Sequence, residues 1–387
     1  MVRDVLYVSA LCSNKLEQRM LMMAPKEVGI QIQKYHRLLA TGFLKNNINT
    51  YALSYNRTAN NIRNYPLNEK EDGIEYQYIK AKTNMMSHAE VILKSFLKSV
   101  DFLHKHNDMF VICDVLNLSI SIGAWAAAKL CKREFVGIIT DFPEMVIASH
   151  KKKSIYWWLI RHCSSYVLLT EEMKKKVDVS KKRCVVLEGH VDYRMNDESY
   201  TKAKKWSGIN CVYAGGLHKK YGISTLISAF VKSDIPNSVL HIYGDGDYAN
   251  EIRKMNNKHI VYHGIVSNQN VVAAEQAATL LINPRPTNEE FTKYSFPSKN
   301  MEYMASGTPV LTTNLSGMPQ EYYPYVYRFF DETVEGMSET LREVLGLPQS
   351  TLLAKGDQAK KFVLEKKNNV VQAEKIINMV ENVQCGK

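Results

Sequence analysis

The stretch TNEEFTKYSFPSKNMEYMASGTP, residues 287–309, decides how the second half of this chain is expected to fold. It follows the apolar run 278–283, which predicts a buried strand. Ser295 is expected to cap a helix, with Pro297 at an early helical position where a missing N–H costs nothing. The helix should end at Gly307, because glycine readily adopts the left-handed conformation that follows a helix.

Four polar residues of this predicted helix are three, four or seven positions apart, and so fall on or near one face: Ser295, Ser298, Lys299 and Glu302. A helix N-terminus carries partial positive charge, Lys299 adds a cation, and Glu302 lies one turn deeper. This arrangement suits a nucleoside diphosphate, with its phosphates at the N-terminus and Lys299 and its ribose hydroxyls on Glu302. A capped amphipathic surface helix would give the same pattern.

The chain has 387 residues, which favours two domains, and its net charge of +11 indicates an anionic partner such as nucleic acid, a membrane or a phosphorylated small molecule. Seven cysteines are scattered without a C-x-x-C pair, so neither a disulfide framework nor a zinc site is predicted. The N-terminus lacks a signal-peptide layout, and the apolar run near 116–130 is too short and interrupted to span a bilayer. We expect the protein to reside in a reducing cytoplasm.

Short apolar strands alternate with helical patterns almost throughout, which predicts an α/β fold with parallel sheets covered by helices on both faces. The expected strands are 5–10, 51–54, 109–115, 135–140, 166–169, 184–187, 210–214, 238–243, 259–262, 278–283 and 308–312. Helices are expected within 26–44, from Ser87 with a capping box to Glu90, and from Thr351 onward. Another should bury one apolar stripe, formed by Ile223, Leu226, Ile227, Phe230 and Val231.

The polar segment 193–207 interrupts this alternation and is interpreted as a linker. We therefore expect domains at 1–195 and 205–365, with a C-terminal helix at about 366–387 packing back on the first. The simplest architecture is two doubly wound, Rossmann-like domains facing each other across a cleft, with ligands at the carboxyl ends of the strands.

Several motifs after strands could carry chemistry. Gly215 and Gly216 form a glycine turn that lets backbone approach a phosphate, and Lys219 and Lys220 would add charge; a purely structural turn is the alternative. The D-x-D after Gly244 could hold a metal–nucleotide complex, although a strand-to-helix turn explains it better.

Two single charged residues also follow strands. Arg285 could bind an anion or be a solvated loop residue. Asp141 could be a catalytic or acceptor-binding carboxylate, or only a turn-former before proline.

The second half of the chain resembles the retaining GT-B glycosyltransferases of family 4, in the segments YAGGLHKKYGISTLISAF, HIYGDGDY, HGIVS, LLINPRP and SFPSKNMEYMASGTPV. Weaker matches are VLLTEEMKKKV and LEGHVD, before the predicted linker. The resemblance implies transfer of a sugar, with retention, from a nucleotide diphospho-sugar to a hydroxyl acceptor, without a bound metal. The first domain would then serve the acceptor and the second the donor.

The resemblance also implies residue roles. Glu302 would bind the ribose, with Ser298 beside it, Lys299 and Arg285 would stabilise the leaving diphosphate, and Asp141 would serve the acceptor. Tyr294 stands where the family has the first glutamate of its E-x7-E motif, and Gly216 and Tyr221 stand where the family has an arginine and a lysine.

Such substitutions resemble a bacterial branch that builds capsular and exopolysaccharide units, which implies a lipid-linked saccharide acceptor. A nucleotide-sugar epimerase on the same fold, a non-catalytic binding subunit and a basic nucleic-acid-binding protein are the alternatives. The lysines are spread and form no recognition module, so no nucleic-acid partner is expected.

The segment HKKKSIYWWLIR, residues 150–161, places lysines beside Tyr156, Trp157 and Trp158. Lysine attracts anionic headgroups and tryptophan prefers the membrane interface, so the segment could lie on the inner face of the plasma membrane. A helix whose tryptophans belong to the core is the alternative.

Overall fold

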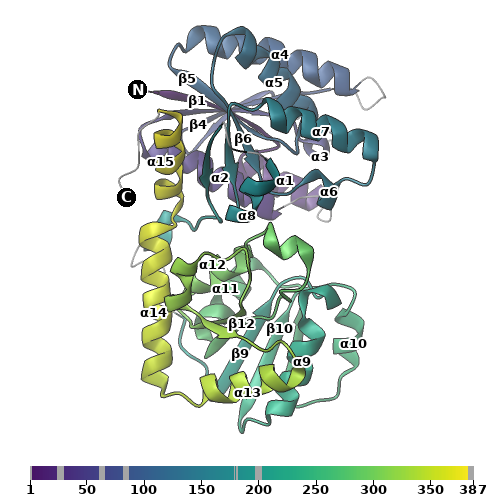
Figure 1. The fold of residues 1–387 in the computed structure, drawn as a ribbon, viewed down its shortest axis with the longest axis vertical. Coiled ribbons are helices and arrows are strands. Elements are labelled where there is room, and N and C mark those ends of the chain that lie inside the picture. The colour runs from purple at the N-terminus through teal and green to yellow at the C-terminus, as the bar shows by residue number, and fades with distance from the viewer. Residues whose placement is uncertain are drawn as a thin grey trace. The chain divides into compact units, whose positions relative to one another are not determined.

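The structure is a computed structural model that describes residues 2–23, 30–60, 66–81, 87–177, 179, 182–196 and 203–381. Its contacts divide the chain into a first unit, Met1–His190 with Asn369–Lys387, and a second unit, Val191–Asn368. Each unit is built on one sheet flanked by helices (Figure 1). Among the described helices, none has the length and apolar character needed to cross a bilayer.

The first unit has an eight-stranded sheet in the order β3-β4-β2-β1-β5-β6-β7-β8, with every pair parallel except β3–β4. Its strands are β1 (Asp4–Ser9), β2 (Asn49–Ser54), β3 (Asn68–Glu71), β4 (Ile74–Tyr78), β5 (Met109–Asp114), β6 (Phe135–Ile139), β7 (Ser165–Leu168) and β8 (Arg183–Val186). Its helices are α1 (Asn14–Met23), α2 (Ile30–Lys45), α3 (Arg57–Asn60), α4 (Ser87–Lys105), α5 (Leu118–Leu130), α6 (Pro143–Val146), α7 (His150–His162), α8 (Glu171–Val177) and α15 (Asn369–Val380).

The C-terminal helix α15 packs on α2 and contacts β8, so the last described helix of the chain belongs to the first unit. Ala373 and Ile376 of α15 are buried in the same core cluster as Phe43 of α2. The two helices approach backbone to backbone, because a Cβ on Gly42 would lie 2.1 Å from the carbonyl oxygen of Asn369. Glycine at this position is therefore what allows α15 to dock.

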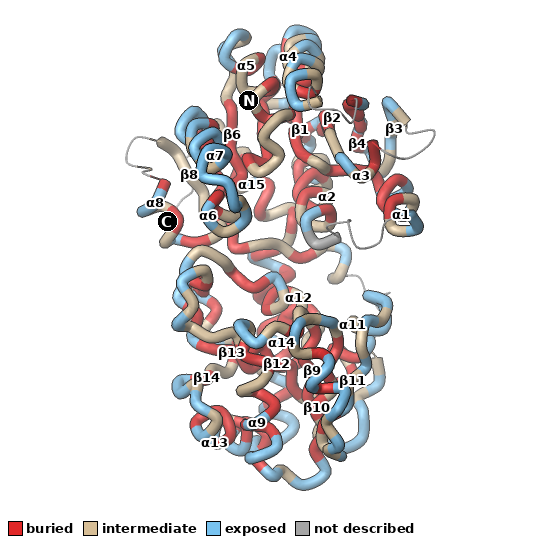
Figure 2. The backbone as a smooth tube through the Cα atoms, turned by 90° about the vertical axis from the view of Figure 1, so that its right-hand side faces the viewer, coloured by how far each residue is buried: buried red, intermediate tan, exposed pale blue. Residues whose placement is uncertain are grey.

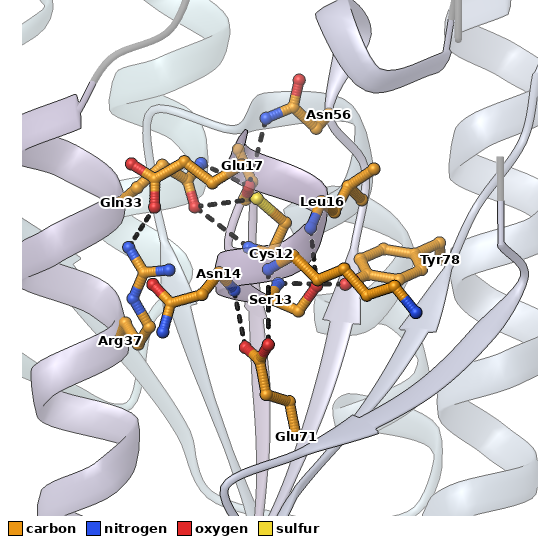
Figure 3. A network of polar contacts seen from close by, with 12 residues as sticks. Cys12, Ser13, Asn14, Leu16, Glu17, Gln33, Arg37, Asn56, Glu71 and Tyr78 are labelled. Atoms are coloured by element: carbon orange, nitrogen blue, oxygen red, sulfur yellow. Dashed lines mark hydrogen bonds and ion pairs between the residues drawn. The ribbon is translucent and has the colours of Figure 1, made fainter. Parts of the chain in front are cut away.

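A polar network joins the end of β1 to α1, α2 and the β3–β4 hairpin (Figure 3). Glu71 of β3 accepts the Asn14 N–H at 2.6 Å, which satisfies an amide at the start of α1. Ser13 Oγ accepts the Leu16 N–H at 3.1 Å and donates to Glu69 at 2.6 Å. The β3–β4 hairpin therefore caps helix α1, which ends more than forty residues before the hairpin begins.

The second unit has six parallel strands in the order β11-β10-β9-β12-β13-β14. They are β9 (Ile209–Ala214), β10 (Ser238–Tyr243), β11 (Ile260–Gly264), β12 (Leu280–Asn283), β13 (Val310–Thr313) and β14 (Tyr327–Phe329). The helices are α9 (Ile223–Ser233), α10 (Ala249–Lys254), α11 (Asn268–Ala277), α12 (Ser298–Ser306), α13 (Val334–Leu345) and α14 (Gln349–Lys366).

Alternate residues of β9 enter different cores, as the period of a strand requires. Cys211 and Tyr213 pack in a cluster with α9 and α13, whereas Val212 and Ala214 pack in a cluster with α11, α12 and α14. The sheet is thus buried on both faces, and its strands are the buried layer in Figure 2.

Every strand expected from the sequence is present, with ends that differ by at most two residues. The helix after the glycine turn buries Ile223, Leu226 and Phe230, but Val231 is 42% exposed, so its place on the buried stripe was predicted wrongly. The predicted cap was also wrong. Helix α12 begins at Ser298 with Pro297 in the cap position, and the Ser295 hydroxyl instead donates to the carbonyl of Phe291.

The expected end of α12 is confirmed, because Gly307 has φ of 80°. The expected helix within 26–44 is α2, and residues 24–29 lie outside the described part of the chain. In the segment interpreted as a linker, Tyr193–Asn196 form a 3₁₀ turn, and residues 197–202 are not described.

Candidate functional site

A pocket of about 400 Å³, including its solvent-open part, lies in the second unit at the carboxyl ends of β9 and β12. In a doubly wound sheet this edge is where ligands bind. The pocket is lined by Tyr213, Ala214, Gly215, Gly216, Tyr221, Asn283, Arg285, Pro297, Ser298, Lys299 and Tyr303. Helix α12 begins at Ser298, so the positive end of its dipole is part of the wall.

Two tyrosines hold the glycine turn in place. The buried Tyr303 hydroxyl, on α12, accepts the Ala214 N–H at 2.8 Å and lies 3.3 Å from the Ala214 carbonyl oxygen. The Tyr213 hydroxyl donates to the Gly216 carbonyl at 2.8 Å. The end of β9 is therefore fixed to α12, and the turn that follows is fixed to β9.

Two other glycines let neighbouring loops touch this turn. A Cβ on Gly222, which has φ of 80°, would lie 2.1 Å from the carbonyl oxygen of Pro284. A Cβ on Gly244, which has φ of 123°, would lie 1.9 Å from the carbonyl oxygen of Gly215. Both positions are closed to other residues by backbone conformation and by space, so the loops after β9, β10 and β12 form one packed edge.

Lys299 reaches the pocket from α12 already paired with a carboxylate. Its ammonium lies 2.9 Å from Glu302 Oε2, three residues further along the helix. Burial works against the charged ammonium, but the carboxylates of Glu302 and Glu275 together outweigh burial and raise the pKa of Lys299. The ammonium therefore stays protonated well into the alkaline range.

Arg285 enters from the loop after β12 and is held by aromatic rings. Its guanidinium carbon lies 4.8 Å from the centroid of Tyr221 and 5.6 Å from that of Phe291. Burial lowers the pKa of Arg285, and the hydroxyls of Tyr221 and Tyr213 oppose that effect. Arginine remains charged at all ordinary pH values, so the pocket holds a partly desolvated cation.

The pocket brings together five residues singled out in the sequence: Gly215, Gly216, Arg285, Ser298 and Lys299. Glu302 contacts the pocket through Lys299. Lys219, Lys220, Tyr294 and Gly244 are not among the lining residues.

Lys219 and Lys220 are exposed, and their ammonium groups lie over the rings of Tyr248 and Tyr221. The backbone of Gly244 lies against the carbonyl of Gly215. Tyr294 is half-buried and ends a 3₁₀ turn. That Lys219 and Lys220 add charge to the glycine turn stays a prediction.

The D-x-D motif after β10 joins its own loop to the loop after β9. Asp247 accepts the Lys219 N–H at 3.1 Å and lies 3.0 Å from His218 Nδ1. Within the described residues there is no group of three or more His, Cys, Asp or Glu side chains that could hold a metal ion. The geometry favours the turn interpretation of this motif.

Asp141 belongs to the first unit, two residues after the end of β6. Burial raises the pKa of its carboxyl group, a hydrogen bond from the Thr140 side chain lowers it, and the nearby Asp114 raises it further. Perturbed carboxyl pKa values are found at functional sites and in structural ion-pair networks alike.

Six lining residues were not singled out as pocket residues: Tyr213, Ala214, Tyr221, Asn283, Pro297 and Tyr303. Asn283 donates to Asn300 Oδ1 at 2.7 Å, and Asn300 donates to Thr312 Oγ1 at 3.3 Å, so a buried amide chain connects β12, α12 and β13. Spacing could have found Tyr303, because it follows Lys299 by four positions and so shares its side of the helix.

Residues 208–345 match the protein-family model described as "Glycosyl transferases group 1". No curated protein matches the chain by sequence. Among solved structures, sucrose-phosphate synthase from Thermosynechococcus elongatus is similar over 99% of this chain and 100% of that chain, at 11% identity and TM-score 0.66. A glycosyltransferase from Rickettsia africae is similar over 100% of both chains, at 13% identity and TM-score 0.65.

Anabaena HepE, solved with UDP, is similar over 98% of this chain and 100% of that chain, at 11% identity and TM-score 0.64. At these identities the likeness concerns the fold. The fold is GT-B, as the sequence resemblance implied. The family match lies within the second unit, which also holds the pocket.

The bond between Tyr303 and Ala214 is open to test. Tyr303→Phe leaves the buried Ala214 N–H without its partner, which should destabilise the protein by about 1–3 kcal/mol. Tyr243→Phe is the matched control, because Tyr243 is also buried in the second unit and its ring stacks on that of His263. Chemical denaturation of both variants measures the difference, and equal losses would show that the hydrogen bond contributes nothing.

Proposed function

We propose that this protein is a retaining glycosyltransferase that moves a sugar from a nucleotide diphospho-sugar to a hydroxyl acceptor. The observation that supports the proposal is the pocket in which Arg285, Lys299 and the start of α12 converge beside a glycine turn. These are the groups that recognise a diphosphate. HepE, which shares the fold, was solved with UDP and with UDP-glucose, and a nucleotide of this kind suits the pocket by analogy.

Leaving-group stabilisation is the main catalytic effect in this proposal. Negative charge grows on the diphosphate as its bond to the sugar breaks, and Arg285, Lys299 and the α12 N-terminus would stabilise that charge. Removing one such preorganised donor typically costs about 10²–10³ in kcat. Glu302 would accept hydrogen bonds from the ribose hydroxyls, with Ser298 beside it. Front-face attack by the acceptor hydroxyl would give retention and would need no protein nucleophile.

The acceptor would bind the first unit, with Asp141 as a hydrogen-bonding carboxylate. We propose a lipid-linked saccharide in capsular or exopolysaccharide synthesis as the acceptor class, and a cytoplasmic location peripheral to the plasma membrane. No metal cofactor takes part in the proposed mechanism, because the cationic side chains and the helix dipole replace it.

Incubation with a panel of nucleotide sugars and saccharide acceptors tests the reaction. The expected result is release of a nucleoside diphosphate together with a glycosylated acceptor, at equal rates with and without EDTA. An epimerase would change the sugar without lasting release of the nucleotide, and a binding subunit would leave the donor intact. Activity that collapses with EDTA and returns with Mn²⁺ or Mg²⁺ would overturn the metal-free mechanism.

Substitutions of Glu302 and of Lys299 should change different kinetic constants. Glu302→Gln should mainly raise the donor KM, because the ribose is bound equally in ground state and transition state. Lys299→Met keeps the apolar stem but removes the charge that faces the diphosphate, and should lower kcat by roughly 10²–10³. Steady-state kinetics on folded variants decides. A Glu302→Gln variant with unchanged donor kinetics would refute the nucleotide assignment of α12.

The membrane hypothesis rests on helix α7. The Trp157 Nε1–H donates to Glu144 at 2.8 Å and its ring stacks on Phe142, so this tryptophan belongs to the folded unit. Trp158 is 37% exposed and Ile155 is 45% exposed. Lys151 and Lys152 are exposed in the first turn of the same helix. The surface therefore combines cations with apolar side chains.

A charge reversal of Lys151, Lys152 and Lys153 to glutamate should greatly reduce binding to vesicles that contain anionic lipid, because each lysine contributes about 1 kcal/mol near such a surface. The matched control reverses Lys174, Lys175 and Lys176, which pair with Glu171, Glu172 and Glu144. Co-sedimentation measures both. Equal binding by the wild type and the α7 variant would remove the hypothesis.

A further inference from the structure

The two cations of the donor pocket are held by different kinds of partner. Lys299 is paired with the Glu302 carboxylate at 2.9 Å. In the described part of the chain, no ion pair involves Arg285; its side-chain contacts are the faces of Tyr221 and Phe291. Lys299 thus shares its charge with a carboxylate before any ligand binds, whereas Arg285 does not.

An aromatic face attracts a cation without neutralising it. The ring quadrupole stabilises a guanidinium placed over it, but a ring accepts no in-plane hydrogen bond from the N–H groups. The N–H donors of Arg285 therefore remain available to a ligand, and their planar, forked arrangement matches a pair of diphosphate oxygens. A carboxylate partner at the same place would have used those donors.

The position of Tyr221 is fixed from both ends. It closes the 3₁₀ turn Lys219–Tyr221, and the next residue is Gly222, whose backbone touches Pro284. Pro284 directly precedes Arg285. The loop that carries the Tyr221 ring and the loop that carries the Arg285 guanidinium therefore meet one residue from each of these two residues. On the other side, His218 packs edge-on against Tyr221 at 5.3 Å.

We propose that Tyr221, with Phe291 on the other loop, is a positioning residue that holds the Arg285 guanidinium unpaired and oriented for the donor diphosphate. The inference rests on the proposed function and adds a division of labour to it. Arg285 supplies the uncompensated charge, and Lys299 acts together with Glu302. The family that this chain resembles has a lysine at the position of Tyr221. In this chain a tyrosine takes the place of that lysine, and its ring positions the guanidinium of Arg285.

The test compares Tyr221→Leu with Tyr221→Phe. Loss of the ring should lower kcat for donor cleavage roughly 3- to 30-fold, the range of a partly desolvated cation–π contact. The phenylalanine variant keeps the face and should restore most of the wild-type kcat. In an Arg285→Ala background, Tyr221→Leu should lower kcat less than twofold further, because its effect passes through Arg285.

Tyr323→Leu is the matched control. It removes an equivalent ring, 3.9 Å from the Arg328 guanidinium, among residues that do not line the pocket, and should leave kcat unchanged. Equal losses in Tyr221→Leu and Tyr221→Phe, or an undiminished Tyr221→Leu effect in the Arg285→Ala background, would overturn the inference.

Calorimetric titration with UDP and with inorganic pyrophosphate separates this inference from the proposed function. Wild type should bind both ligands, and Tyr221→Leu should bind each more weakly than Tyr221→Phe does. A wild type that turns over a nucleotide sugar while all Tyr221 variants match it would refute only the role of Tyr221. A wild type that neither binds these ligands nor cleaves any donor would refute both proposals.

Discussion

Backbone contact between three loops is the constraint on which the pocket depends. The loops after β9, β10 and β12 meet at Gly222 against Pro284 and at Gly244 against Gly215, at separations that leave no room for a Cβ. Tyr303 then ties the end of β9 to α12 through the Ala214 amide. Because interiors are close-packed, a shift of one loop moves its neighbours. The side chains of Arg285 and Lys299 take their positions from this edge.

Periodicity predicted the strands because both sheets are buried on two faces, where near-continuous apolar runs are required. It missed β3 and β4, which read as charged residues in NEKEDGIEYQY. The Asp72–Gly73 pair has positive φ at both residues, the backbone of a two-residue hairpin turn, and D-G is a hairpin signal that could have been used. β14 was missed because its three residues are too few to show a pattern.

The pocket includes the predicted residues whose position is fixed by local geometry, and it leaves out two that other contacts place elsewhere. Gly215, Gly216, Ser298 and Lys299 follow strand ends or begin a helix, so sequence position alone places them at the carboxyl edge. Lys219 and Lys220 are equally close in sequence, yet their turn leaves them exposed. The assignment of Ser295 as the cap failed because Phe291 supplies a carbonyl for its hydroxyl. Contacts of this kind cannot be read from spacing.

The net charge of +11 does not describe the pocket. Its lysine, Lys299, is paired with the Glu302 carboxylate, and its arginine, Arg285, lies over the ring of Tyr221. Surface lysines pair with neighbouring carboxylates or are screened by salt, so their number sets long-range attraction but not recognition. Recognition of a diphosphate needs a cation that has lost part of its water and kept its donors. Burial among aromatic residues achieves both at Arg285, since rings exclude water without accepting its N–H groups. A pocket in which one cation is paired with a carboxylate can in this way stay selective for anions, provided that a second cation has no carboxylate partner.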